Sequence, residues 1–311
     1  MRELQVKDIL FGAAYYPEYM PYDRLQEDIA MMQKAGMNTI RIAESTWSTL
    51  EPAEGVYDFS YIDKALAAAE EAGMYVIIGT PTYAIPSWLE KKCPEVMVFD
   101  GYSRKKYGKR QIMDIVHPVF RKCAENVICK LLEHTANVSC VIGFQIDNET
   151  KHYGTASPQV QRMFVEYLKT KFHTTEQLNE VFGLRYWSNS ISDWSDFPDM
   201  AGCIHGGLAC EFAKFQRSLA AEYLVWQSEL VKKYKRQDQF ITHNFDFEWK
   251  KFGADIAQDG YSYGVQPDIN HYEASKAVTI AGTDIYHPTQ DGLTGAEIGF
   301  GGDSIRTLKD D

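Results

Sequence analysis

The chain has 311 residues, 45% hydrophobic and 24% charged, a balance that excludes disordered, collagen-like and disulfide-stapled proteins. Its 32 Lys and Arg against 43 Asp and Glu give a formal net charge of −11 without a basic stripe, so nucleic acid is not an expected partner. No run reaches the ~18 apolar residues that span a membrane, and residues 1–8 lack the apolar core of a signal peptide, so we expect no membrane partner.

Six cysteines occur, and none forms a C-x-x-C pair. Without an export signal, they predict a reducing cytoplasm as the compartment.

Strands and helices alternate along the first half of the chain. Apolar runs predict strands over residues 9–14, 38–42 and 74–79, and amphipathic helices over about 22–35 and from Ser60 to Gly73. In the second of these helices, Ile62, Leu66 and Ala69 share one face, and Ser60 is the expected N-cap. This order indicates a parallel sheet that helices cover.

The second half continues the pattern with one long interruption. A helix is predicted over 118–134 and strands over 140–146, 240–243 and 278–283. Between the fourth and fifth strands the chain is mostly helical, with an irregular aromatic segment at 186–198. No linker or repeat divides the chain, so we predict one domain over residues 1–311.

A doubly wound sheet and a (β/α)8 TIM barrel both fit this alternation. The first strand lacks the G-x-G-x-x-G turn of a nucleotide-binding sheet, which also argues against a nicotinamide-dependent enzyme. Polar and aromatic residues instead follow the carboxyl ends of several strands, where barrel enzymes build their active sites. We therefore predict an incomplete TIM barrel of about six βα units.

The segment Gly143–Glu149 carries the strongest chemical signal. It runs from an apolar strand into Asn148 and Glu149, and so places an amide and a carboxylate at the mouth of the barrel. Glycosidic cleavage needs a carboxylic acid that protonates the departing oxygen, and a second carboxylate. Glu149 suits the first role, although helix capping or a loop salt bridge would also explain a Glu here.

The Q-I-D-N-E of residues 145–149 resembles the acid/base segment of the family 42 glycoside hydrolases, the β-galactosidases of the Asn-Glu barrel clan. Further ordered resemblances cover nearly the whole chain. They are Tyr15–Glu18, Glu44–Pro52, Gly55–Phe59, Gly79–Thr82, Pro86–Leu89, Thr242–Phe245 and Asp284–Tyr286.

The resemblance implies roles for five residues. Glu149 would be the general acid/base of a retaining β-galactosidase, and Asn148 its hydroxyl-binding neighbour. Arg110 matches an arginine that contacts galactose, with a solvated loop arginine as the alternative. Trp47 and Tyr286 are candidates for the pocket wall, and core or rim packing explains each of them equally well.

The sequence departs from the family pattern in two places. No cysteine lies in residues 150–154 or 111–114, where the family carries a zinc cluster, so we predict no structural metal, and no cofactor is implied. The family nucleophile is a Glu at the end of the seventh strand, whereas Glu297 matches the helix after the sixth. The expectation is therefore an N-terminal barrel part that lacks its nucleophile and is nearly inactive alone.

Two alternatives to cleavage of a galactoside or oligosaccharide stay open. The substrate could be another β-glycoside, such as an arabinopyranoside or a glucoside. The chain could also bind carbohydrate without cleaving it. Because an open barrel exposes strand edges, self-association into a homo-oligomer is a further expectation.

Overall fold

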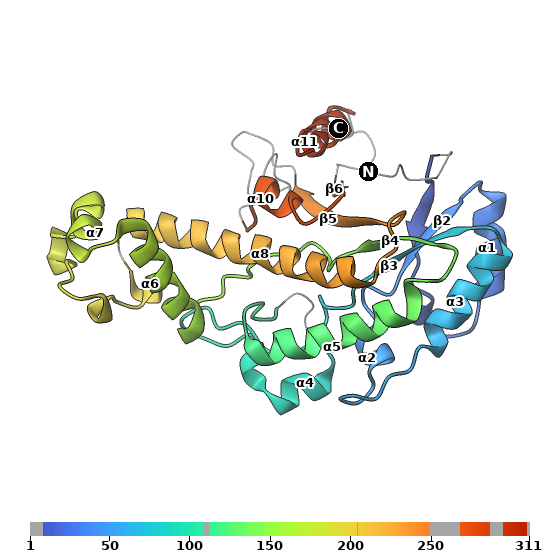
Figure 1. The fold of residues 1–311 in the computed structure, drawn as a ribbon, viewed down its shortest axis with the longest axis horizontal. Coiled ribbons are helices and arrows are strands. Elements are labelled where there is room, and N and C mark those ends of the chain that lie inside the picture. The colour runs from blue at the N-terminus through green and yellow to red at the C-terminus, as the bar shows by residue number, and fades with distance from the viewer. Residues whose placement is uncertain (1–8, 109–111, 204, 249–267, 287–294, 310–311) are drawn as a thin grey trace.

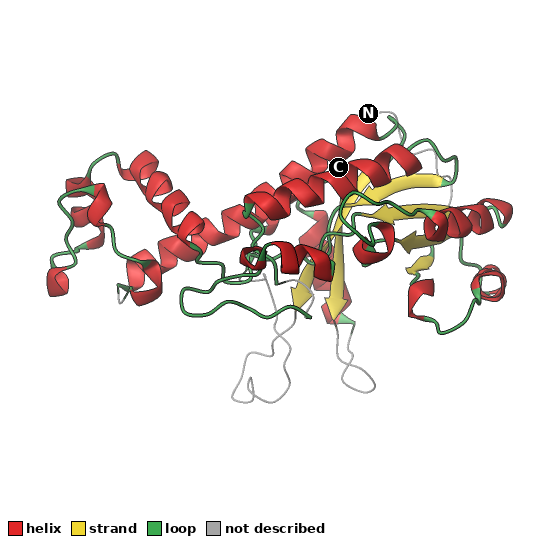
Figure 2. Ribbon diagram, turned by 90° about the horizontal axis from the view of Figure 1, so that it is seen from below, coloured by secondary structure: helices red, strands yellow, loops and turns green. Residues whose placement is uncertain are grey.

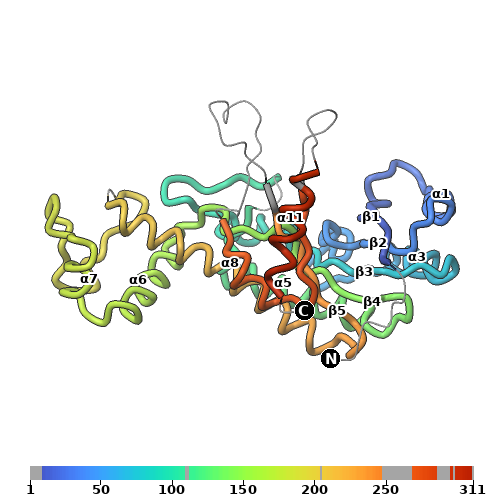
Figure 3. The backbone as a smooth tube through the Cα atoms, turned by 90° about the horizontal axis from the view of Figure 1, so that it is seen from above, coloured from blue at the N-terminus to red at the C-terminus, as the bar shows by residue number. Residues whose placement is uncertain are grey.

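The computed structural model describes residues 9–108, 112–203, 205–248, 268–286 and 295–309. Within these ranges, six strands form one sheet in the order β1-β2-β3-β4-β5-β6, and every neighbouring pair is parallel. Figure 3 shows the strands following one another across the sheet in chain order. The strands are β1 Gly12–Ala14, β2 Thr39–Ile42, β3 Tyr75–Gly79, β4 Val141–Gln145, β5 Phe240–Glu248 and β6 Ile280–Tyr286.

Helices connect each strand to the next. This arrangement is that of an incomplete (β/α)8 barrel and confirms the predicted fold class. The described helices are α1 Leu25–Lys34, α2 Trp47–Leu50, α3 Ser60–Glu71, α4 Ser87–Lys92, α5 Pro118–Thr135, α6 Pro158–Phe172, α7 Thr175–Phe182, α8 Gly206–Tyr234, α10 His271–Ser275 and α11 Ala296–Arg306.

The core lies between the sheet and its covering helices. Ile62, Leu66 and Ala69 of α3 are buried, as the helical spacing predicts. Helices α5 and α8 run side by side under the sheet, where Phe120 packs against Tyr223 with ring centroids 6.0 Å apart (Figure 1). The two helices thus form one layer that supports β3, β4 and β5 from behind.

The long connection between β4 and β5 is helical, as predicted, and builds a projecting lobe. Helix α8 extends beyond the sheet and carries α6 and α7 at its far end (Figures 1 and 2). Local signals set the bounds of these helices, since the Ser157 and Thr174 side chains accept hydrogen bonds from first-turn amides of α6 and α7. Gly183 ends α7 in the left-handed conformation, at φ 62°.

Some element boundaries differ from the prediction. Ser60 is the first residue of α3 instead of its cap, because the Asp58 side chain accepts the hydrogen bond from the Ser60 amide at 2.9 Å. Strand β5 runs to Glu248 because its register with β6 continues through Tyr286. Glu297 lies in α11, as expected.

Candidate active site

A pocket opens where the carboxyl ends of β4, β5 and β6 meet. Glu149 and Asn148 come just after β4, Asn244 lies in β5, and Asp284 lies in β6. Tyr16 and Arg41 close the opposite side of this space, which has a volume of about 390 Å³. The volume is in the range of small-molecule sites, and the lining is polar.

Asn244 joins the three strand ends through its side-chain amide. Its Nδ2 donates to Asn148 Oδ1 at 2.8 Å and to Asp284 Oδ2 at 2.7 Å. Its Oδ1 accepts a hydrogen bond from the Glu149 amide at 3.3 Å. Every atom of this amide that can form a hydrogen bond is therefore engaged in holding Asn148, Glu149 and Asp284 around one point.

Asp284 and Glu149 form a pair of interacting carboxyl groups. Burial, with the hydrogen bond and negative charge of Glu149, raises the pKa of Asp284 to about 6, against the opposing effects of the Asn244 hydrogen bond and the Arg41 charge. Two carboxyl groups this close cannot both ionise without cost. Asp284 therefore keeps its proton closer to neutral pH than an exposed aspartate does.

Arg41 brings positive charge to the other side of the pocket. Its Nη2 lies 2.9 Å from Glu44 Oε1, and the Tyr16 hydroxyl donates to the same oxygen at 2.7 Å. The Glu44 carboxylate is fully buried, so this pair is far less exposed to solvent than a surface ion pair. Glu44 thus orients Arg41 and Tyr16 through hydrogen bonds.

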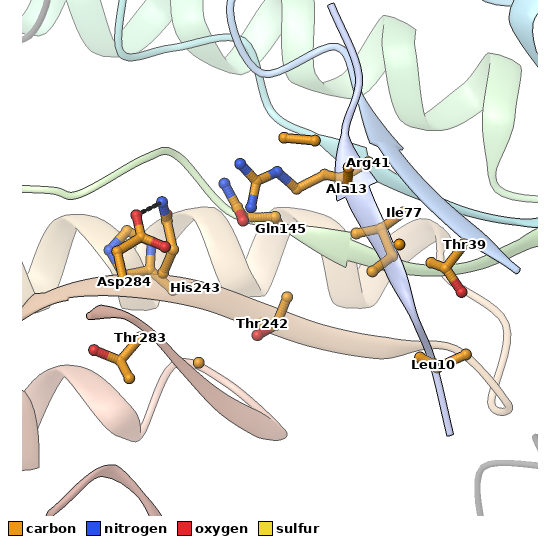
Figure 4. Close-up of a pocket in the computed structure, with 14 residues that line it drawn as sticks. Leu10, Ala13, Thr39, Arg41, Ile77, Gln145, Thr242, His243, Thr283 and Asp284 are labelled. Carbon is orange, nitrogen blue, oxygen red and sulfur yellow. Dashed lines mark hydrogen bonds between the residues drawn. The ribbon is translucent and has the colours of Figure 1, made fainter. Parts of the chain in front are cut away.

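A second space lies deeper, inside the curve of the sheet. Figure 4 shows Arg41 from β2, Gln145 from β4, and His243 and Asp284 from neighbouring strands around it. Arg41, Asn244, Thr283 and Asp284 line both spaces, so the pocket at the mouth continues into the sheet interior. Burial lowers the pKa of His243 to about 4 and keeps this imidazole neutral at physiological pH.

The structure brings together two of the five candidate residues from the sequence. Glu149 and Asn148 are adjacent in the pocket. Arg110 lies outside the described residues. Trp47 is fully buried in the core, where its Nε1 donates to Glu51 Oε2 at 2.7 Å and its ring packs on Phe120. Tyr286 is the last residue of β6 and pairs with Glu248.

Sequence reasoning missed Arg41 and Asp284 as site residues. Arg41 stands inside a predicted strand, where a single charge at an inward position was the available signal. Asp284 belongs to a segment that resembles the family, but the resemblance assigned it no role. His152, three residues after Glu149, is buried, with its Nδ1 accepting from the Gly154 amide and its Nε2 3.3 Å from Asp268.

Neither a metal-binding cluster nor a membrane-spanning helix is found in the described ranges. Among these residues, no group of three His, Cys, Asp or Glu side chains is placed to hold a metal ion. No helix in the described part of the chain is long and apolar enough to cross a membrane.

Known β-galactosidases resemble this chain in sequence and structure. It is 31% identical over 252 residues to beta-galactosidase BgaA of Thermus sp, covering 76% of this chain and 38% of the relative. It is 28% identical over 280 residues to beta-galactosidase LacZ of Lactobacillus acidophilus, covering 83% and 41%. The chain thus spans less than half the length of these relatives.

Solved structures give the same result. A catalytic mutant of Gan42B, a family 42 beta-galactosidase from G. stearothermophilus, has a TM-score of 0.87 at 26% identity, over 98% of this chain and 44% of that one. The cold-adapted beta-galactosidase from Rahnella sp. has a TM-score of 0.85 at 26% identity, with the same coverage.

The sequence model of glycoside hydrolase family 42, described as beta-galactosidase, matches residues 14–309. This match covers the last residue of β1, the whole of β2 to β6, and the pocket at their ends. The chain therefore belongs to glycoside hydrolase family 42.

Proposed function

We propose that this chain carries the acid/base half of the active site of a retaining β-galactosidase. The observation that carries the proposal is the place of Glu149, at the carboxyl end of β4 in a polar pocket, beside Asn148 and a second carboxyl group. In this proposal Asn148 hydrogen-bonds a sugar hydroxyl. By resemblance to the family, Arg110 and Tyr286 also contact the substrate. Trp47 supports the site from the core.

The chemistry divides into two steps. In the first, Glu149 gives its proton to the departing glycosidic oxygen while a carboxylate nucleophile bonds to the anomeric carbon and the carbon–oxygen bond breaks. In the second, Glu149 takes a proton from the water that displaces this nucleophile. The proposal assigns no described carboxylate as nucleophile, because Asp284 hydrogen-bonds to Glu149, whereas the two carboxyl groups of a retaining enzyme stand about 5–5.5 Å apart.

The test replaces the acid and varies the leaving group. In the full-length protein, Glu149→Ala should lower turnover of an alkyl β-galactoside by about 100-fold or more, since an alcohol leaves only when protonated. Formation of the glycosyl-enzyme from an activated aryl β-galactoside should fall far less, because a phenolate leaves unaided. The measurement is the rate of leaving-group release from each substrate.

Glu273→Gln is the matched control, since Glu273 pairs with Lys276 at the surface, away from the pocket. It should match the parent on both substrates. An equal loss on both substrates in Glu149→Ala would contradict the acid role. If the protein binds galactose in calorimetry but hydrolyses no galactoside, a carbohydrate-binding role is supported instead. Faster hydrolysis of an arabinopyranoside or a glucoside than of a galactoside would identify that glycoside as the substrate. We also propose that the protein is cytoplasmic and that it forms a homo-oligomer.

A further inference from the structure

A buried polar network lies directly beneath Asn148 and Glu149. We propose that Asp147 is a positioning residue, whose carboxyl group holds the turn that presents Asn148 and Glu149 to the pocket. This inference rests on the proposed function of Glu149 and assigns a role that the acid/base chemistry itself does not require. Three features support this role: the backbone of the turn, the contacts of the carboxylate, and the groups that orient those contacts.

The backbone of this turn needs support from outside. Asp147 has φ 48° and Glu149 has φ 44°, so two non-glycine residues with Asn148 between them adopt the left-handed region. Each such residue is strained and persists only where surrounding structure holds it. Left alone, the turn would relax and move the Glu149 carboxyl group.

The Asp147 carboxylate makes a hydrogen bond on each of its oxygens. Thr82 Oγ1 donates to Oδ1 at 2.6 Å, and the Thr150 hydroxyl donates to Oδ2. The first contact ties the turn to the loop after β3, and the second closes the turn on itself. All three side chains are buried, so water does not compete for these bonds.

The backbone of Asp147 is held as firmly as its side chain. Its amide donates to Thr80 Oγ1 at 2.6 Å, and its carbonyl accepts from Gln145 Nε2 at 3.1 Å. Thr80 and Thr82 both come from the segment after β3, and Gln145 ends β4. The residue is therefore fixed from two neighbouring strands.

Gln227 of α8 sets the direction of the two threonine hydroxyls. Its Oε1 accepts from Thr80 Oγ1 at 2.6 Å, which leaves the lone pairs of Thr80 to accept from the Asp147 amide. Its Nε2 donates to Thr82 Oγ1 at 2.8 Å, which leaves the Thr82 proton to be given to Asp147. One amide thus arranges each hydroxyl for the partner it needs at Asp147.

Burying a carboxylate carries a large desolvation cost. In the described part of the chain, the groups that hydrogen-bond to this side chain are the neutral hydroxyls of Thr82 and Thr150 and the Asn148 amide, and no Lys or Arg pairs with it. An apolar residue of similar size would avoid the desolvation cost. The contacts explain the choice, because an acceptor with two oxygens is what joins Thr82 to Thr150 across the turn.

The experiment compares removal of the carboxyl group with its conservative replacement. Asp147→Ala removes both acceptors. Asp147→Asn keeps an oxygen for Thr82 and can donate its amide proton to Thr150, and Asn tolerates the left-handed region. Asp114→Ala is the control, because Asp114 is equally buried but accepts from Val116 near α5, outside the turn.

Two readouts are expected to move together. Asp147→Ala should lower turnover of an alkyl β-galactoside by about 100-fold while lowering leaving-group release from an aryl β-galactoside much less, as a misplaced acid would. In a Glu149→Ala background the same change should leave this substrate ratio unmoved. Asp147→Asn should stay within about 10-fold of the parent, which is the cost of one neutral hydrogen bond at most.

The second readout does not depend on activity. Amide hydrogen exchange of residues 146–150, followed by mass spectrometry, should accelerate at least 10-fold in Asp147→Ala and stay near the parent rate in Asp147→Asn and Asp114→Ala. Unchanged exchange in Asp147→Ala, or equal loss on both substrates, would overturn the positioning role. If the full-length parent hydrolyses neither galactoside, the proposed function fails, and the exchange result still decides the role of Asp147.

Discussion

The buried carboxyl group of Asp147 titrates closer to neutral pH than an exposed aspartate. Burial raises its pKa from 3.8 to about 6, against the hydrogen bonds from Thr150 and Thr82. The folded protein therefore holds this proton more tightly than the unfolded chain. The stability that follows is complete below pH 4 and is lost as pH rises through 6.

This difference predicts a pH-dependent effect of Asp147→Asn. The difference between a pKa of 3.8 and one of about 6 corresponds to on the order of 3 kcal/mol in the free energy of unfolding. Asparagine does not titrate and so lacks this pH-dependent contribution. The free energy of unfolding of Asp147→Asn, relative to the parent, should therefore rise by that order between pH 4 and pH 7. Urea unfolding of both proteins at several pH values measures it.

The comparison with the variant isolates Asp147 from its neighbours. Tyr153 and Tyr223 beside it have pKa values raised well above 10 by burial, and partly by the Asp147 charge, so they do not titrate in this range. Burial lowers the pKa of His243 and His271 to about 4, and their contribution is lost as pH falls from 6.5, which is the opposite sign. Parallel stability curves for parent and variant would contradict the assignment.

At this scale, the sequence predicts what is local. Asn148 and Glu149 follow an apolar strand, and that pattern alone places them at the mouth of a barrel. The partners that make the site are distant along the chain, since Thr82 lies 65 residues before Asp147 and Gln227 is 145 residues from Thr82. No local pattern reports such pairs, because the fold creates them.

The contact between β2 and β3 sets the position of Glu44, and Gly79 makes that contact close. A Cβ built on Gly79 would lie 2.5 Å from Glu44 Cβ and 3.0 Å from its backbone. Gly79→Ala must therefore push apart the ends of two paired strands, and overpacking of this kind costs about 1–3 kcal/mol. We expect that loss in the free energy of unfolding, measured by urea denaturation.

A glycine with free space supplies the control for this substitution. Gly302 lies inside α11 with no atom within 4 Å of a built Cβ, so Gly302→Ala should stabilise by about 0.5–1 kcal/mol through helix propensity. Gly79→Ala should also weaken the pairing of Glu44 with Arg41 and Tyr16. A Gly79→Ala protein as stable as the parent would show that the strand ends have room to shift.

The type of an element was predictable from sequence where its hydrophobic periodicity extended over many residues. Its boundaries were not predictable where a side-chain hydrogen bond decided them. The buried positions of α3 follow the helical spacing, and Pro118 begins α5 as predicted. Ser60 and Asp58 are both good caps, and sequence does not say which side chain reaches the free amide. Strand β5 exceeds its apolar run because the backbone of β6 continues to pair with polar residues such as Asp246.

At the scale of the whole molecule, the sheet curves but has two edges within the described residues. There β1 pairs only with β2, and β6 only with β5. Apolar side chains lie exposed at or near these edges, at Ile9, Phe11 and Ile280. An edge of this kind offers unpaired backbone groups to another strand. The order of the elements along the chain was predictable, whereas the degree of exposure at the edges required the structure.

The two edges predict that the 311-residue chain self-associates. The net charge of −11 opposes association, so the weight-average mass by light scattering should rise with protein concentration and with added salt, which screens repulsion. Ile280→Lys places a charge at the β6 edge and should lower that mass. Val181→Lys is the matched control, since Val181 is also an exposed β-branched residue but lies in α7, in the projecting lobe. A parent chain that stays monomeric in high salt, or an equal effect of the two substitutions, would show that the edges do not drive association.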